Sequence, residues 1–315
     1  MKTIYTCGPT VYAIPHIGNL RTFAHADNIR KKLEEGGNVV KHVINITDID
    51  DKIMKEVGLE NVTFDEKKHL PIIKEFTEPI IQKFKSDLVE IGVDISKINF
   101  VNVSDHLLDM KIFVEELQNN GKAYYSKEKK AIVLKNDLMD EGADFSLWKV
   151  DKNRPGWHLE CTVLSRLLLG AEFDIHTGGC DLKFPHHHNE NLQSIAYDNK
   201  PLAKEWVYTE HLFVDGKKMS KSLNNAYTLT DLKNMGFTGF DLRNLFEKYN
   251  YENHMDFTFE KLKSSIQKKI NVNSLIVDLN KIRTELRENH LYDFSDKIRN
   301  SLVENGFYVN DKKTV

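Results

Sequence analysis

Short apolar runs and a longer amphipathic stretch alternate at the start of the chain. Residues 2–6 and 39–46 are rich in β-branched side chains, which is typical of strands. The stretch between them, residues 18–33, predicts a helix that stops before Gly36 and Gly37. A strand–helix–strand order favours parallel pairing, because the helix carries the chain back across the sheet. We therefore expect an α/β fold with a parallel sheet, whose ligands bind at the carboxyl ends of the strands.

The pattern changes in residues 63–147. Two helical stretches precede two short alternating segments that predict a pair of strands, and the first sheet is expected to resume at residues 145–149. After Ser222 the pattern is mainly helical. The predicted elements are helices at 66–91, 105–118 and 158–169, strands around 123–125, 131–134 and 173–176, a helix from 186 to about 197, helices at 230–235 and 241–249, a long helix from 259 towards 286, a helix at 294–304 and a strand-like tail at 307–309.

Composition limits the class of protein and the cellular location that the chain is expected to have. Its 315 residues include 44 basic and 47 acidic side chains, with a formal net charge of −3. This balance does not favour a general nucleic-acid binder, so such a contact would need a local basic face. No run approaches the ~20 apolar residues of a membrane span, and the start lacks the pattern of a signal peptide. Three cysteines are too few for a disulfide framework, which indicates a reducing, cytoplasmic location.

Several motifs carry a family resemblance. Residues 16–19 (HIGN) and 218–222 (KMSKS) together resemble the HIGH and KMSKS signatures of class I aminoacyl-tRNA synthetases. Residues 46–53 (ITDIDDKI), 154–161 (RPGWHLEC) and 173–190 (FDIHTGGCDLKFPHHHNE) lie between them in order. Over residues 1 to about 260 the chain therefore resembles the cysteinyl-tRNA synthetase family.

The resemblance implies a domain organisation. It implies a Rossmann-like class I synthetase catalytic domain of the α/β class with a parallel sheet, a connective insertion and a short helical C-terminal region. After residue 260 the resemblance weakens, and an anticodon-binding domain is not expected. The expected parts are residues 1–62 and 148–222 for the split catalytic domain, 63–147 for the insertion, 223–258 for a stem-contact region and 259–315 for the truncated helical region.

The resemblance also implies one zinc ion per chain, bound by Cys7, Cys161, His186 and Glu190. The local pattern agrees, because residues four apart such as His186 and Glu190 share one face of a helix. Thiolate, imidazole and carboxylate are all zinc ligands. Zinc that accepts one more ligand could bind the substrate cysteine as a thiolate and reject serine. Spacing alone would equally allow both cysteines to be small buried residues.

Three neighbours of these ligands are not expected to bind metal. His187 and His188 are interpreted as bystanders, although His188 stands where the family usually has Glu. Cys180 is interpreted as a residue that only packs.

ATP with Mg²⁺ is the implied second substrate. Amides at the start of the helix after His16 favour phosphate, and lysines would neutralise charge that builds during adenylate formation. Three acids, Asp48, Asp50 and Asp51, are interpreted as helix-capping residues. The implied roles are catalysis for His16, Asn19, Lys218 and Lys221, ATP binding for Gly8, His16, Asn19, Gly178, Gly179, Asp181 and Lys221, and amino-acid binding for Thr10, Trp157 and His158.

Three functions remain open from the sequence. The first is a monomeric ligase that activates L-cysteine and transfers it to the 3′ end of tRNA-Cys, recognising the tRNA through its acceptor arm. The second is a cysteine ligase of the mycothiol-pathway type, which passes cysteine to an amino sugar. The third is a non-catalytic remnant that binds tRNA or zinc, and the intact motifs argue against it.

Overall fold

A five-stranded parallel sheet forms the centre of residues 1–266. The computed structural model of the chain describes residues 1–135, 146–219, 225–266 and 272–304. Strand order in the sheet is β3-β2-β1-β8-β9, and each strand pairs in parallel with its neighbour. The bounds are Lys2–Thr6 for β1, Val40–Ile46 for β2, Ile98–Asn102 for β3, Phe173–Gly179 for β8 and Ala203–Thr209 for β9.

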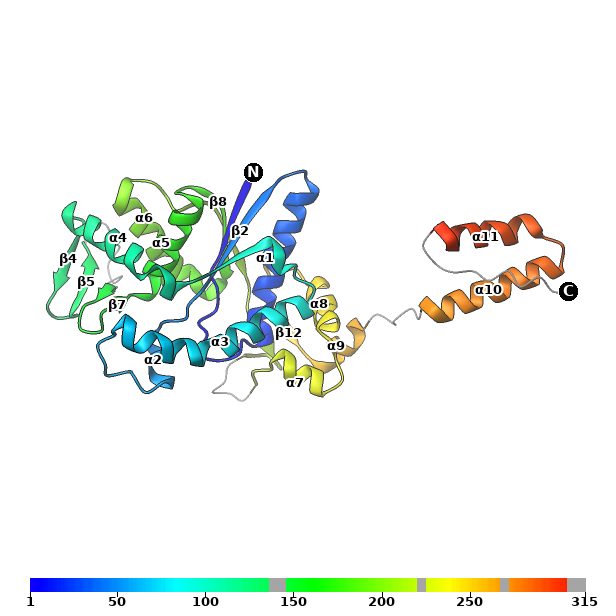
Figure 1. Cartoon of the computed structure of the whole chain (residues 1–315), viewed down its shortest axis with the longest axis horizontal. Helices are drawn as coiled ribbons and strands as arrows, with labels where there is room; N and C mark the ends of the chain where they lie inside the picture. The colour runs from blue at the N-terminus through cyan, green and yellow to red at the C-terminus, as the bar shows by residue number, and fades with distance from the viewer. Residues whose placement is uncertain (136–145, 220–224, 267–271, 305–315) are drawn as a thin grey trace. The chain divides into compact units, whose positions relative to one another are not determined.

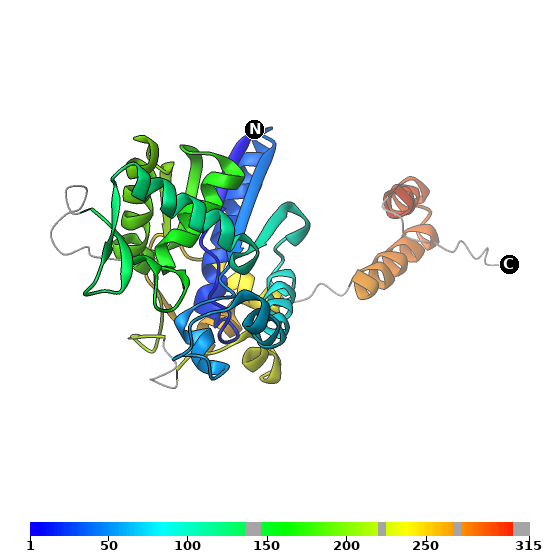
Figure 2. The same cartoon turned by 60° about the vertical axis from the view of Figure 1, so that its left-hand side comes forward.

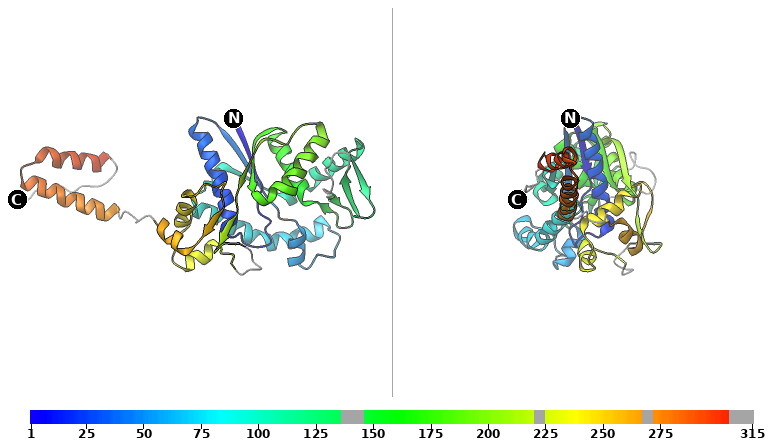
Figure 3. Two further views of the ribbon diagram at one scale, coloured as in Figure 1. Left: turned by 180° about the vertical axis from the view of Figure 1, so that it is seen from behind. Right: turned by 90° about the vertical axis from the view of Figure 1, so that its right-hand side faces the viewer.

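Helices cover both faces of this sheet (Figures 1 and 3). The helix α1 (Ile17–Glu35) connects β1 to β2, and α5 (Trp157–Leu169) leads into β8 on the other side of β1. Right-handed crossovers in opposite directions place their helices on opposite faces. The strand order therefore reverses between β1 and β8, and the carboxyl ends of these two strands border the crevice where such sheets bind ligands.

Further helices complete the two layers. The helix α3 packs against α1, and α6 packs against α5. The remaining bounds in this part are Asp51–Glu56 for α2, Glu66–Glu90 for α3, Ile95–Lys97 for η1, Val103–His106 for η2, Cys180–Leu182 for η4, Lys183–His187 for η5 and His188–Asp198 for α6.

The first predicted elements are confirmed. Strands predicted at 2–6 and 39–46 correspond to β1 and β2, and the helix predicted at 18–33 corresponds to α1. The α/β class with a parallel sheet is confirmed as well. The backbone N–H of Gly36 donates to the carbonyl oxygen of Lys32 at 3.1 Å, and that of Gly37 donates to the carbonyl oxygen of Glu34 at 2.8 Å, so the helix ends where the glycines were expected to stop it.

A second sheet is antiparallel and separate from the first (Figure 2). Its strand order is β4-β5-β6-β7, and α4 (Leu107–Asn119) packs against it. The strand pair predicted around 123–125 and 131–134 is confirmed as β4 and β5. The bounds are Ala123–Ser126 for β4, Ala131–Leu134 for β5, Ser146–Lys149 for β6 and Arg154–Pro155 for β7.

The expectation that the parallel sheet resumes at 145–149 is wrong. These residues form β6, which pairs with β5 and β7 in the antiparallel sheet. The limits of the expected insertion, 63 and 147, also do not coincide with a change of sheet. Within that range β3 pairs with β2 in the parallel sheet, and β6 continues across the upper limit.

A third, three-stranded sheet follows, in the order β11-β10-β12. The helices predicted at 230–235 and 241–249 correspond to α7 and α8, each begun by a threonine capping box. The bounds are Leu212–Val214 for β10, Lys217–Lys218 for β11, Leu229–Asn234 for α7, Gly239–Glu247 for α8, Met255–Phe257 for β12 and Phe259–Ser265 for α9.

The long helix expected from 259 towards 286 is wrong, because α9 ends at Ser265 and a separate helix, α10 (Val272–Glu288), begins later. Residues 267–315 form a second compact unit, in which α10 packs against α11 (Tyr292–Glu304). The strand-like tail predicted at 307–309 lies outside the described residues. Within the described ranges, every helix is too short or too polar to cross a membrane.

Candidate active site

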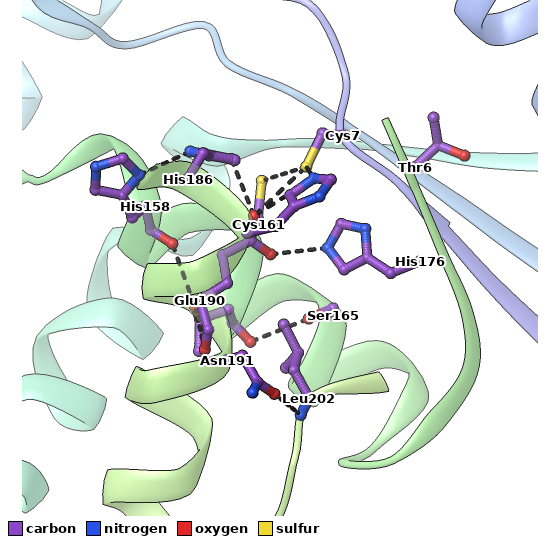
Figure 4. A network of polar contacts seen from close by, with 12 residues as sticks. Thr6, Cys7, His158, Cys161, Ser165, His176, His186, Glu190, Asn191 and Leu202 are labelled. Carbon is purple, nitrogen blue, oxygen red and sulfur yellow. Dashed lines mark hydrogen bonds and ion pairs between the residues drawn. The ribbon is translucent and has the colours of Figure 1, made fainter. Parts of the chain in front are cut away.

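The four side chains expected to bind zinc lie together at the carboxyl end of β1 (Figure 4). Cys7 directly follows β1, Cys161 belongs to α5, Glu190 belongs to α6, and His186 lies in the turn η5 just before it. One sulfur, nitrogen or oxygen atom from each residue lies within 4.8 Å of the others, and all four residues are buried. Three elements that are distant in the sequence thus meet at the point where the strand order reverses.

Glu190 is the negative centre of this cluster. Its Oε1 lies 3.0 Å from His186 Nε2, and its Oε2 lies 2.8 Å from His176 Nε2. Burial alone would raise the pKa of Glu190, but the imidazoles of His176 and His186 hold it well below its usual value. Burial would likewise lower the pKa of His186, yet the Glu190 carboxylate and the Cys161 sulfur raise it to about 10.

The two thiols have opposite ionisation tendencies. Their sulfur atoms are 3.5 Å apart. Burial, together with the hydrogen bond to Cys161, raises the pKa of Cys7 well above its usual value. Burial also favours the thiol of Cys161, but the hydrogen bond from Cys7 and the nearby His186 lower the pKa of Cys161 to about 6. A divalent cation would ionise both, because coordination deprotonates a thiol.

His158 holds the other nitrogen of a candidate ligand. Its Nδ1 lies 2.8 Å from His186 Nδ1, so Nε2 of His186 is the nitrogen directed at Glu190. Burial, followed by the charge of His186, lowers the pKa of His158 to about 3, and the neutral ring can accept the hydrogen bond. A partner of this kind fixes the orientation of a metal-binding imidazole. His158 thus contacts one of the four candidate ligands, and its expected role in binding the amino acid stays a prediction.

His176 and His187 also belong to the cluster. His187 Nε2 lies 3.3 Å from Cys7 Sγ, and Cys7, His176, His187 and Glu190 form a second group of potential ligands within 4.8 Å of one another. His187, interpreted from the sequence as a bystander, therefore contacts a candidate ligand, and whether it binds metal stays untested. His188 belongs to neither group. A histidine in the middle of the buried strand β8 was the sequence signal for His176, since burial of a polar ring requires a partner.

The donor set fits a zinc ion. Two thiols, one imidazole and one carboxylate match the ligand types and the four-coordinate preference of Zn²⁺. All four side chains are buried, and the Glu190 carboxylate is paired with the His176 and His186 imidazoles, so the cluster keeps a buried negative charge next to two thiols.

A cavity of about 440 Å³ adjoins the cluster, which is a volume typical of small-molecule sites. It contains most of the residues expected to bind substrates. The expected residues among its lining are Cys7, Gly8, Thr10, His16, Asn19, Trp157, Gly179 and Asp181.

The signature residues His16 and Asn19 begin α1 as a capping pair. Asn19 N–H donates to His16 Nδ1 at 3.2 Å, and His16 N–H donates to Asn19 Oδ1 at 3.1 Å. Such a reciprocal pair satisfies amides that the first turn leaves unpaired. A Cβ at Gly18 would lie 3.0 Å from the His16 ring, so a larger residue there would crowd the capping pair.

The glycines of the site are needed for close packing. A Cβ on Gly8 would lie 1.5 Å from the carbonyl oxygen of Asn45, so Gly8 permits contact with β2 as well as lining the cavity. A Cβ on Gly178 would meet the His187 ring at 2.8 Å. Gly179 leaves room for Asp181, whose Oδ1 would lie 2.5 Å from a Cβ there.

Of the two signature lysines, only Lys218 lies in the part of the chain that the structure describes. Lys218 lies in β11, where its backbone pairs with Phe213, and Lys221 lies outside the described residues. A cation that sequence reasoning missed is Lys52, which lines the cavity and lies 4.8 Å from the centre of the Tyr12 ring. Its position one residue after three acids was the available signal.

The three acids before α2 have three different roles. Asp50 caps α2, with its Oδ1 accepting from Lys52 N–H at 2.7 Å. Asp48 accepts hydrogen bonds from the backbone and hydroxyl of Ser104. Asp51 pairs with Lys149 and Arg154, and so connects α2 to β6 and β7. The capping interpretation is thus confirmed for Asp50 alone.

Comparison with known sequences gives consistent matches. The sequence profile described as "tRNA synthetases class I (C) catalytic domain" matches residues 1–152 and 128–267. A cysteine--tRNA ligase of Koribacter versatilis is 35% identical, over 90% of this chain and 62% of its own length. A cysteine--tRNA ligase of Brachyspira hyodysenteriae is 35% identical, over 95% of this chain and 72% of its own length. One of Chlamydia felis is also 35% identical, over 82% of this chain and 61% of its own length, so the chain spans 61–72% of the length of these curated relatives.

Solved structures agree in fold. Mycobacterium tuberculosis methionyl-tRNA synthetase, in complex with methionyl-adenylate, has a TM-score of 0.64 at 13% identity, covering 92% of this chain and 72% of that one. Thermus thermophilus arginyl-tRNA synthetase has a TM-score of 0.58 at 12% identity, and the match covers 92% of this chain and 65% of that one.

Proposed function

The chain belongs to the class I (C) tRNA synthetase catalytic-domain family, and from that premise we propose that it activates L-cysteine with ATP and transfers the cysteinyl group to the 3′ end of tRNA-Cys. The observation that supports this most strongly is the convergence of Cys7, Cys161, His186 and Glu190 beside the cavity that His16 and Asn19 line. A site for a thiol and a site for a nucleotide then share one crevice.

We propose that the cluster selects cysteine through zinc. A bound zinc ion would take the substrate thiolate as a further ligand, which serine cannot supply equally well. A site that depends on one specific ligand can discriminate by ~10⁴–10⁵ without an editing step. His158 would keep His186 oriented, and Trp157, whose ring centre is 4.4 Å from that of His186, would border the side chain of the substrate.

We propose that the other half of the cavity binds ATP. The amino end of α1 and the His16–Asn19 pair offer donors to phosphate, and Asp181 offers a carboxylate to the ribose hydroxyls. Lys52 brings a positive charge to the same space. Lys221 is proposed to stabilise the charge that develops on the phosphates as the cysteine carboxylate attacks, and Mg²⁺ would accompany the nucleotide.

tRNA remains the acceptor that we favour. Among the relatives compared, each is named as a cysteine--tRNA ligase, and none points to the amino-sugar ligase or to a non-catalytic remnant. We propose that the tRNA approaches through its acceptor arm, because the adenylate must meet the 3′ end in the cavity.

The test compares zinc content and activation. The purified full chain should contain about one zinc ion and should exchange pyrophosphate into ATP with cysteine but not with serine. Cys161→Ser should lose both properties, whereas Cys180→Ser should keep them, since Cys180 belongs to neither group around Glu190. Charging should then occur with total tRNA and not with an amino sugar. Normal selection of cysteine by a zinc-free protein would contradict the proposal.

A further inference from the structure

A third group of potential metal ligands lies at the wall of the same cavity, apart from Glu190. Cys180 and Asp181 belong to η4, directly after β8, and His211 lies between β9 and β10. Their sulfur, carboxylate oxygen and ring nitrogen atoms all lie within 4.8 Å of one another. Asp181 and His211 line the cavity, so an ion held here would lie at its surface.

The backbone that carries His211 is held from several sides. Arg21 Nη1 donates to the carbonyl oxygen of Glu210 at 2.6 Å, and the N–H of Glu210 donates to Tyr251 O at 2.9 Å. The carbonyl of His211 accepts from Met255 N–H at 3.1 Å. In η4, the Asp181 carboxylate lies close to Gly179, where a Cβ would be 2.5 Å from its Oδ1. Ligands on such fixed backbone need little reorganisation to bind an ion.

Glu210 adds a second carboxylate next to the thiol. Its side chain accepts a hydrogen bond from Cys180, and its Oε2 lies 3.1 Å from His254 Nδ1. Burial, followed by this carboxylate, raises the pKa of the Cys180 thiol to about 11. A thiol of this kind is a poor nucleophile at neutral pH, which argues against a redox-sensing cysteine. A thiophilic cation would still replace its proton, and Glu210 would then face a positive ion.

The ligand types decide which cation fits. Mg²⁺ prefers oxygen ligands and keeps its waters, so a thiol and an imidazole do not suit it. One thiolate, one imidazole and one carboxylate with an open fourth position suit zinc or a similar borderline divalent ion.

We propose that Cys180, Asp181 and His211 form a second, weaker binding site for a thiophilic divalent cation such as zinc, and that an ion bound there excludes the nucleotide. The exclusion rests on the proposed function, because the ion and the ribose hydroxyls would compete for the Asp181 carboxylate at the wall of one cavity. By linkage, the nucleotide must weaken metal binding by the same factor as the metal weakens nucleotide binding.

The test uses Co²⁺ as the probe on the full chain already carrying one equivalent of zinc. Parent protein should bind a further Co²⁺ ion with a thiolate-to-metal absorption band. Cys180→Ser should lose the band and bind this ion at least tenfold more weakly, since even outer partners of a metal change affinity by about 10–100-fold. His211→Gln should lower the affinity for this ion but should leave the Cys180 thiolate as a ligand, so the absorption band should remain. His188→Gln is the matched control, because His188 belongs to none of the three groups of potential ligands, and it should retain the band.

Adenosine tests the exclusion, because it lacks the phosphates that would chelate the ion. Increasing adenosine should weaken Co²⁺ binding in parent protein, and saturating Co²⁺ should weaken adenosine binding by the same factor. An unchanged band in Cys180→Ser, or simultaneous binding of both ligands without mutual weakening, would overturn the inference. Cys180-dependent metal binding in a chain that never binds adenosine would support the metal site and refute the proposed nucleotide site instead.

Discussion

Replacement of Asp51 by Asn should destabilise residues 1–266 through a buried arginine. Arg154 in β7 has a side chain that is only 2% exposed, and its Nη2 donates to an Asp51 oxygen. Lys149 in β6 pairs with the other oxygen of the same carboxylate. The substitution keeps the shape of the side chain and removes the charge, so Arg154 would stay buried beside a neutral amide.

The expected change in the free energy of unfolding depends on how exposed the Asp51 and Arg154 side chains are. A hydrogen bond to a charged group contributes about 1.5–3 kcal/mol, and leaving a charge buried without its partner costs more. Asp51 is itself 58% exposed, however, so water screens part of the interaction, and the pair with the partly exposed Lys149 adds little. We therefore expect a loss of about 1–2 kcal/mol in the free energy of unfolding, near the lower limit for a charged hydrogen bond.

Urea unfolding followed by tryptophan fluorescence is a suitable assay, because Trp148, Trp157 and Trp206 all lie in residues 1–266. Asp50→Asn is the matched control. It removes the same charge one residue earlier, but at a helix N-cap Asn serves about as well as Asp, so its effect should stay within about 0.5 kcal/mol.

A functional readout accompanies the stability measurement. The residues after Arg154 lead directly into Gly156 and Trp157, and Gly156 N–H donates to the carbonyl oxygen of Leu147 at 2.8 Å. Loosening β7 should raise the KM for cysteine more than the KM for ATP. The reasoning would be refuted if Asp51→Asn and Asp50→Asn unfolded at the same urea concentration. It would also be refuted if adding Arg154→Met to Asp51→Asn failed to recover stability.

Three further outcomes are expected. Gly178→Ala should lower the free energy of unfolding in urea by about 1–3 kcal/mol, because its Cβ would lie 2.8 Å from the His187 ring. Gly36→Ala should lower it less, because no atom there lies nearer than 3.4 Å to the added Cβ. Burial would raise the pKa of Asp174, but hydrogen bonds from Thr3 lower it to about 2; its stabilisation should therefore be present above pH ~4 and lost towards pH 2, where Asp174→Asn and parent should unfold alike. Lys221→Ala should lower pyrophosphate exchange by about 10²-fold with little change in cysteine affinity, and an unchanged rate would contradict its role.

Much of the central sheet could be predicted because its inner strands carry clear patterns. β1 and β2 are dense in β-branched residues, and Gly36 marks the end of the helix between them. The two edge strands were not predicted. Polar residues interrupt both strands, with Asn99 exposed in β3 and Lys204 and Glu205 exposed in β9, so their apolar alternation is weak.

The assignment of β6 failed for a different reason. Its four residues have the composition of a strand, but nothing local distinguishes pairing with β5 from pairing with the parallel sheet. That choice depends on tertiary contacts.

The metal ligands could be predicted from motif residues, while their surroundings could not. His186 and Glu190 were found by their spacing, but the roles of His176 and His158 depend on which nitrogen of each ring meets which partner. Such pairings appear only when β8, α5 and α6 are brought together in space. Lys52 was missed for the same reason, since only folding brings it into the same cavity lining as Asp181.

The capping pair at the start of α1 determines where His16 carries its proton. Because Nδ1 accepts the N–H of Asn19, that nitrogen cannot hold a hydrogen, and the neutral ring must carry it on Nε2. The fold thus selects one tautomer, and the cavity gains an uncharged N–H donor whose identity does not depend on the ligand. The first turn of α1 and the donor that His16 offers to the cavity therefore depend on the same hydrogen bond.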